Sequence, residues 1–89
     1  MVLKELKASN TPTITDKSII NLKNSLKILD TSNNPNITDD SVKYLNLTEL
    51  TALSCETITD ESIAHMNLKV LLAFGNNKIT QKSNGCVIS

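Results

Sequence analysis

Few side chains in this 89-residue chain could take part in covalent chemistry or metal binding. It has two cysteines, Cys55 and Cys86, and a single histidine, His65. A nucleophilic cysteine needs an adjacent base and a metal site needs closely spaced ligands. No second ligand lies at metal spacing from Cys55, and no nucleophile or carboxylate is placed to use His65. We therefore predict no catalytic residue, no metal and no cofactor, and we expect the protein not to be an enzyme.

The C-terminal tail, residues 84–89, carries the one chemical motif. Its last four residues, Cys86-Val87-Ile88-Ser89, match the C-a-a-X signal for prenylation, in which a final serine usually selects farnesyl. The expected product is a thioether at Cys86, with removal of Val87, Ile88 and Ser89 and methylation of the new terminus. The alternative is that these residues are only the aliphatic end of a repeating fold and that the thiol stays unmodified.

A single lipid gives only reversible membrane binding, and Lys78 and Lys82 are too few for a supporting basic patch. We expect a cytoplasmic protein that exchanges between the cytosolic faces of membranes and soluble prenyl-binding carriers. Its enzyme partner would be a prenyltransferase. No secretory signal or membrane-spanning stretch is found. If the chain is bacterial, the tail favours an effector that is modified in the cytoplasm of a host cell.

Composition excludes other classes of function. Nine basic and nine acidic residues balance, and no run of cations exists, so we predict no binding to nucleic acid. Hydrophobic residues make up 39% of the chain and aromatic residues only 2%, which favours a thin, regular core of aliphatic side chains. One domain of this size buries about 60% of its unfolded surface, so a large enclosed active site is not expected.

Internal similarity determines the fold prediction, because the chain divides into about three and a half similar units, 3–25, 26–46, 47–67 and 68–83. The first leucines of the units are Leu3, Leu26, Leu47 and Leu68, and the second leucines are Leu6, Leu29, Leu50 and Leu71. A turn position follows in each unit, occupied by Thr11, Asn34, Cys55 and Asn76. An Ile-Thr pair comes next in every unit.

Each repeated position has a structural role. The leucine segment alternates as a short strand does. Asparagine at the turn position can hydrogen-bond backbone groups of the turns on either side, whereas Cys55 and Thr11 are smaller and weaker substitutes. The Ile-Thr-Asp phrase begins a helix, with threonine as N-cap and with Asp16, Asp39 and Asp60 complementing the helix dipole. One unit cannot bury its apolar stripe alone, so successive units must stack.

The pattern resembles the leucine-rich-repeat family, and Cys55 with the Ile-Thr-Asp phrase resembles its cysteine-containing subtype, found in F-box ubiquitin-ligase adaptors. The resemblance covers residues 3–83 and implies an α/β leucine-rich-repeat solenoid as a single domain over residues 1–83. The solenoid would form a short horseshoe segment with a parallel sheet on the concave side and short helices outside. It also implies binding of a protein ligand on the concave face. Neither end has a recognisable capping unit, so the uncovered sheet edge at residues 3–8 offers a route to a dimer.

The outward strand positions grade from charged to apolar along the chain. The apolar residues predicted to bind a partner are Ile28, Leu53, Val70, Leu72 and Phe74. The alternative is that the chain's own tail covers Leu72 and Phe74. We hypothesise a protein-interaction module farnesylated at Cys86. The other hypothesis is a soluble adaptor or substrate-recognition fragment, similar to the repeat arm of F-box proteins, in which the C-terminal motif is accidental.

Overall fold

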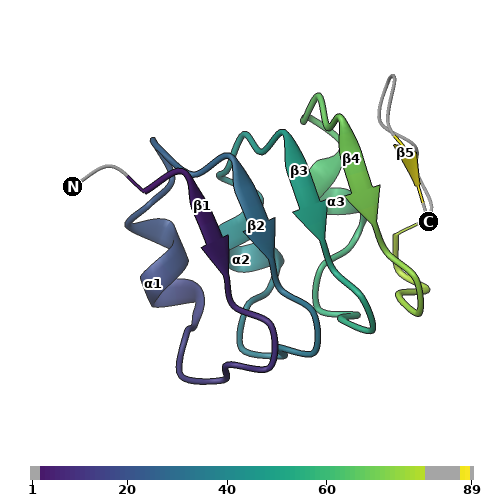
Figure 1. The fold of residues 1–89 in the computed structure, drawn as a ribbon, viewed down its shortest axis with the longest axis horizontal. Helices are drawn as coiled ribbons and strands as arrows, with labels where there is room; N and C mark the ends of the chain where they lie inside the picture. Colours follow the sequence, from purple (N-terminus) through teal and green to yellow (C-terminus); the bar gives the residue numbers. More distant parts are fainter. Residues whose placement is uncertain (1–2, 80–86, 89) are drawn as a thin grey trace.

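The computed structural model describes residues 3–79 and the backbone of residues 87–88, and it is an α/β protein (Figure 1). Short strands alternate with helices of a single turn. In chain order the elements are β1 (Glu5–Lys7), α1 (Asp16–Ile20), β2 (Ile28–Asp30), α2 (Asp39–Val42), β3 (Glu49–Thr51), α3 (Asp60–Ile63), β4 (Val70–Leu72) and β5 (Val87–Ile88). The predicted alternation of strand and helix is therefore confirmed.

All strands join one parallel sheet in the order β1-β2-β3-β4-β5. The register aligns the second leucines, so Leu6, Leu29, Leu50 and Leu71 stand side by side. The three helices lie together on one face of the sheet, α1 against α2 and α2 against α3 (Figure 1). The opposite face, which no helix of the described residues covers, is called the open face below.

The core lies between sheet and helices and is built from the same positions of successive units. Its buried leucines and isoleucines include Leu26, Leu29, Ile37, Leu45, Leu47, Leu50, Ile58, Leu68 and Leu71. The equivalent side chains of the first unit, Leu3, Leu6, Ile14 and Leu22, are only half-buried. They have an apolar neighbour on one side only, because no earlier unit covers them within the part of the chain that the structure describes.

Each unit leaves the sheet through the same backbone conformation. Asn10, Asn33, Ser54 and Gly75 occupy one position of the unit and all have positive φ, between 53 and 80°. Asparagine and glycine tolerate this left-handed region, so the repeat places suitable residues at three of the four turns. A Cβ at Gly75 would also lie 2.8 Å from the hydroxyl of Ser54, so a larger residue there would require this exposed side chain to rotate.

Among the described residues, none of the helices has the length and apolar character needed to cross a lipid bilayer.

Candidate functional site

The open face carries side chains in rows that run across the strands. One row consists of Glu5, Ile28, Glu49 and Val70, and the next consists of Lys7, Asp30, Thr51 and Leu72. A third row, which includes Leu53 and Phe74, lies just past the ends of the strands. Backbone hydrogen bonds still join the units there, because Ser54 N–H donates to the carbonyl of Phe74 and Asn33 N–H donates to that of Leu53. Parallel pairing at constant register thus brings residues from separate units onto one surface.

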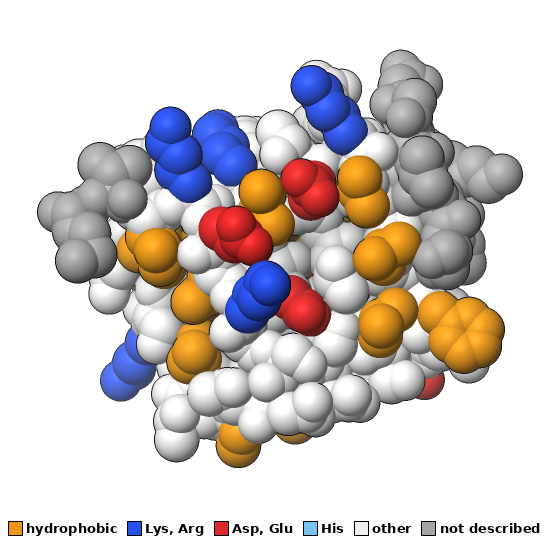
Figure 2. All heavy atoms as spheres, in the orientation of Figure 1, with side chains coloured by type: hydrophobic (Ala, Val, Ile, Leu, Met, Phe, Trp, Pro, Cys, Tyr) orange, Lys and Arg blue, Asp and Glu red, His pale blue; other side chains and the backbone are white. Residues whose placement is uncertain are grey.

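Four of the five residues predicted to bind a partner gather at one end of this face. Leu53, Val70, Leu72 and Phe74 lie on β4 or beside it and form a cluster that we call the apolar patch. Figure 2 shows these hydrophobic side chains together over the β4 side of the sheet. Phe74 is 79% exposed, so the described residues do not cover it, while the other three are half-buried. Most of the tail lies outside the described residues, so the alternative that it covers Leu72 and Phe74 stays a prediction.

Ile28 does not belong to the apolar patch. It lies on β2, between Glu5 of β1 and Glu49 of β3, and Glu49 separates it from Val70. The sequence predicted that Ile28 faces outward, which is correct, but the period of the repeat alone could not show that carboxylates flank it.

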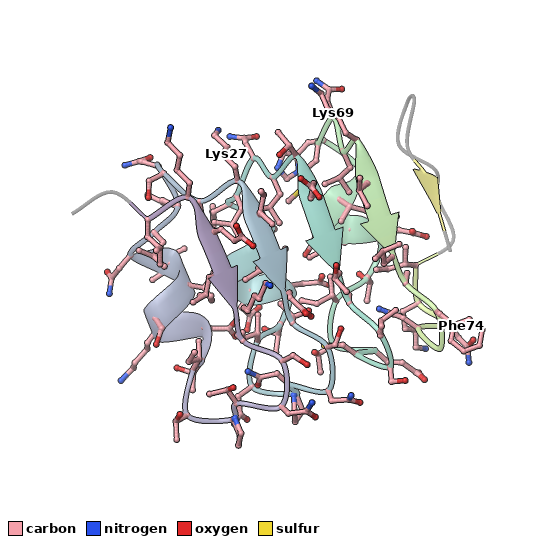
Figure 3. All side chains as sticks on the ribbon, in the orientation of Figure 1. Lys27, Lys69 and Phe74 are labelled. Carbon is pink, nitrogen blue, oxygen red and sulfur yellow. The ribbon has the colours of Figure 1, made fainter. Side chains whose placement is uncertain are left out.

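Charged side chains border the apolar patch on two sides. Glu49 adjoins Val70, and Asp30 lies one strand beyond Thr51 in the row of Leu72. Figure 2 shows acidic side chains in the middle of the open face, beside the hydrophobic side chains over β4, with one lysine among them. Lys27 and Lys69 stand where β2 and β4 begin, and Phe74 lies past the other end of β4 (Figure 3). The patch thus has an acidic flank along the sheet and a basic rim at the start of the strands.

Buried asparagines hold consecutive units together and so fix the rows of the open face. Asn34 Nδ2 donates to the carbonyls of Ala8, Thr11 and Ile14 in the preceding unit, at 3.1, 2.9 and 3.1 Å. Its Oδ1 accepts from Asn36 N–H at 3.1 Å. Asn76 repeats this pattern on the third unit. The predicted bonding of asparagine to a neighbouring turn is confirmed on one side only, because its donors all go to the preceding unit and its Oδ1 accepts within its own turn.

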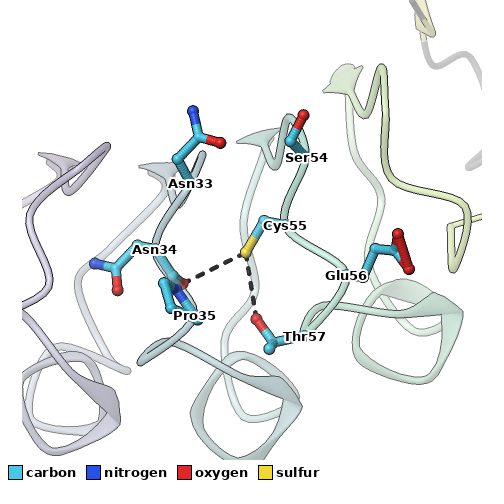
Figure 4. A pocket seen from close by; sticks show the side chains of 7 residues that line it. All are labelled: Asn33, Asn34, Pro35, Ser54, Cys55, Glu56 and Thr57. Carbon is cyan, nitrogen blue, oxygen red and sulfur yellow. Dashed lines mark hydrogen bonds between the residues drawn. The ribbon is translucent and has the colours of Figure 1, made fainter.

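Cys55 takes the place of asparagine in the third unit, and Thr57 supplies part of the missing bonding. Cys55 Sγ lies 3.5 Å from the carbonyl of Asn34 and 3.3 Å from Thr57 Oγ1 (Figure 4). Thr57 Oγ1 in turn donates to Ile37 O at 2.7 Å. A hollow of about 280 Å³ lies beside them, lined by residues 33–35 and 54–57. Within the described part of the chain no base adjoins the thiol, and its contacts are those of a structural residue.

We predict that Cys55 does not react with thiol reagents in the folded protein, because its side chain is only 3% exposed and its thiol hydrogen can bond the carbonyl of Asn34. In the variant Cys86→Ser, Cys55 is the one remaining cysteine, so any labelling reports on Cys55 alone. Labelling of this variant by an aromatic disulfide reagent should be slow in buffer and complete in denaturant. Rapid labelling in buffer would contradict the structural assignment.

The aspartates have a stronger role than the dipole interpretation gave them. Asp16 accepts hydrogen bonds from the backbone N–H and hydroxyl of Thr38, at 2.8 and 2.6 Å, and from the hydroxyl of Ser41 at 2.5 Å. Asp39 receives the same three bonds from Thr59 and Ser62. The Ile-Thr-Asp phrase is therefore an inter-unit connection, and the dipole of a four- or five-residue helix is a secondary effect.

His65 is exposed next to the C-terminal end of α3, as predicted, and its Nε2 lies 2.8 Å from the carbonyl of Leu45. No group of three or more potential metal ligands occurs within residues 3–79. These residues bring no second polar group to His65 that would make it a site.

The structure describes only the middle of the tail motif. Cys86 and Ser89 lie outside the described residues, and the modification of Cys86 stays a prediction. Val87 and Ile88 form β5, which pairs in parallel with β4 through Val70 and Leu71. The aliphatic part of the motif therefore lies at the edge of the sheet next to the apolar patch.

Comparison with known proteins gave no support for any particular family: no family model matches the chain, and neither a curated protein nor a solved structure does.

Proposed function

We propose that this chain is a leucine-rich-repeat solenoid that works as a non-enzymatic protein-binding module, with the apolar patch as its contact surface. The observation that carries the proposal is the cluster of Leu53, Val70, Leu72 and Phe74 on a face that no helix of the described residues covers. A clustered group of apolar side chains with a polar border is typical of interaction sites. The wide exposure of Phe74 supplies an aromatic anchor of the kind that dominates binding energy.

The flanks of the patch define the partner's chemistry. A complementary surface places apolar side chains against Leu72 and Phe74 and a basic group near Glu49 and Asp30, because opposite charges across an interface favour the correct register. The partner is therefore a protein segment in which aliphatic or aromatic residues stand beside lysine or arginine.

Site-specific photo-cross-linking tests this assignment. A benzophenone amino acid replaces Phe74 in one variant and Tyr44 in the other, since Tyr44 is also exposed, at 56%, but belongs to the outer side near α2. Irradiation in cells should yield a discrete protein adduct from position 74 and none from position 44. Equal adducts from both positions, or none from position 74, would refute the patch as the contact surface.

We further propose that Cys86 is farnesylated and that the module associates reversibly with cytosolic membrane faces. The motif supports this, and so does the placement of β5, because a two-residue strand at a sheet edge can be released to a prenyltransferase with the loss of few backbone hydrogen bonds.

The test of this second part is the intact mass of the protein made in eukaryotic cells. We expect the mass of the chain without its last three residues, plus one farnesyl and one methyl group. Cys86→Ser is the control and should move the protein from the membrane fraction to the soluble fraction. An unmodified Cys86 would leave the alternative, a soluble adaptor whose ending is accidental.

A further inference from the structure

β1 presents a free edge within the part of the chain that the structure describes. Lys4 O accepts from Ile28 N–H, and Ala8 N–H donates to Asp30 O, so these groups face β2. Backbone groups alternate in direction along a strand, so the N–H and C=O groups of Glu5 and Lys7 point away from the sheet. At the other end of the sheet the edge strand is β5, which pairs with β4 over only two residues.

An incompletely buried apolar row lies behind this edge. Leu6, Ile14 and Leu22 are half-buried, whereas the residues at the same positions of the second unit, Leu29, Ile37 and Leu45, have 1% or less of their surface exposed. Free strand edges with apolar side chains behind them favour pairing with another chain. We infer that β1 pairs antiparallel with β1 of a second copy, making a symmetric dimer.

The charges of β1 select the register. A two-fold axis at Leu6 places Glu5 opposite Lys7 of the other copy, and Lys7 opposite its Glu5. The backbone groups that point outward then form two hydrogen-bonded pairs, and both side-chain pairs on the open face join opposite charges. A shift in either direction would instead set Glu5 against Glu5 or Lys7 against Lys7, which is unfavourable.

The size of the contact sets the strength of the dimer. The end of the molecule is bounded by its two shorter dimensions, 22 and 18 Å. Such a face buries on the order of 400 Å² per copy, about half the area of a standard interface. We therefore expect a weak dimer with a dissociation constant of about 10 to 1000 μM.

Sedimentation equilibrium of the full chain under reducing conditions tests the inference. The wild type should show a monomer–dimer equilibrium in this range. Lys7→Glu or Glu5→Lys alone creates two like-charge pairs and should weaken the dimer at least about tenfold. The double variant Glu5→Lys/Lys7→Glu restores both pairs and should return the constant to within about threefold of wild type. Lys69→Glu, at the start of β4 and so three strands from this edge, is the control and should leave the dimer unchanged.

A protein that stays monomeric at millimolar concentration would overturn the inference. So would a dimer that the single charge reversals leave intact, or one that the double reversal fails to restore. Circular dichroism melts of every variant separate loss of pairing from loss of folding, because Glu5 and Lys7 are both exposed.

Discussion

Asn34→Asp is expected to abolish folding or to lower the free energy of unfolding by about 4 kcal/mol or more. The substitution keeps the shape of the side chain but replaces Nδ2 by an oxygen that faces the carbonyls of Ala8, Thr11 and Ile14. The new carboxylate oxygen and the three carbonyl oxygens are all hydrogen-bond acceptors, and they would face one another at a site that is 0% exposed. In a domain of this size such a loss corresponds to a fall in Tm of roughly 15 to 30 °C.

Asn46→Asp is the matched control, because it makes the same chemical change on a residue that is exposed to solvent. Its free energy of unfolding should lie within about 0.5 kcal/mol of wild type. Chemical denaturation of both variants provides the comparison. Equal stabilities of the two variants would mean that the buried amide does not join the units.

Asp39→Ala should cost about 3 kcal/mol and lower Tm by roughly 10 to 20 °C. The reason is the loss of the acceptor for Thr59 N–H, Thr59 Oγ1 and Ser62 Oγ. Ser62 is fully buried, so its hydroxyl cannot turn to water for a replacement partner.

Asp40→Ala distinguishes this mechanism from the helix dipole. Both aspartates stand in the first turn of α2, so the dipole gains equally from either, but Asp40 is exposed. A thermal melt should show a loss of no more than about 0.5 to 1 kcal/mol for Asp40→Ala. Similar losses for both variants would favour the dipole and contradict the inter-unit connection.

The repeat made most of the fold predictable. The recurrence of leucine, isoleucine and asparagine at equal positions of each unit indicated the parallel strands, the short helices and the buried core, because identical units must bury identical stripes against one another. It also predicted which residues face outward, including Val70 and Leu72 in β4 and Leu53 and Phe74 just past the ends of β3 and β4.

Two features could not be predicted in this way, because they depend on pairs of units. The aspartate of one unit bonds the threonine and serine of the next, and Thr57 supplies one of the bonds that Cys55 lacks. The sequence shows both residues of each pair, but only the register brings them within hydrogen-bonding distance. The same applies to Ile28, whose separation from the apolar patch follows from the glutamates on the neighbouring strands.

The affinity of the cross-linked partner for three forms of the chain tests the proposed contact surface most directly. Titration calorimetry would compare wild type, Phe74→Glu and Tyr44→Glu, all with unchanged thermal melts. Burial of a charge in place of an aromatic anchor should weaken binding at least about thirtyfold for Phe74→Glu, whereas Tyr44→Glu should bind as the wild type does. Equal affinity of Phe74→Glu and wild type would contradict the assignment of the apolar patch as the contact surface.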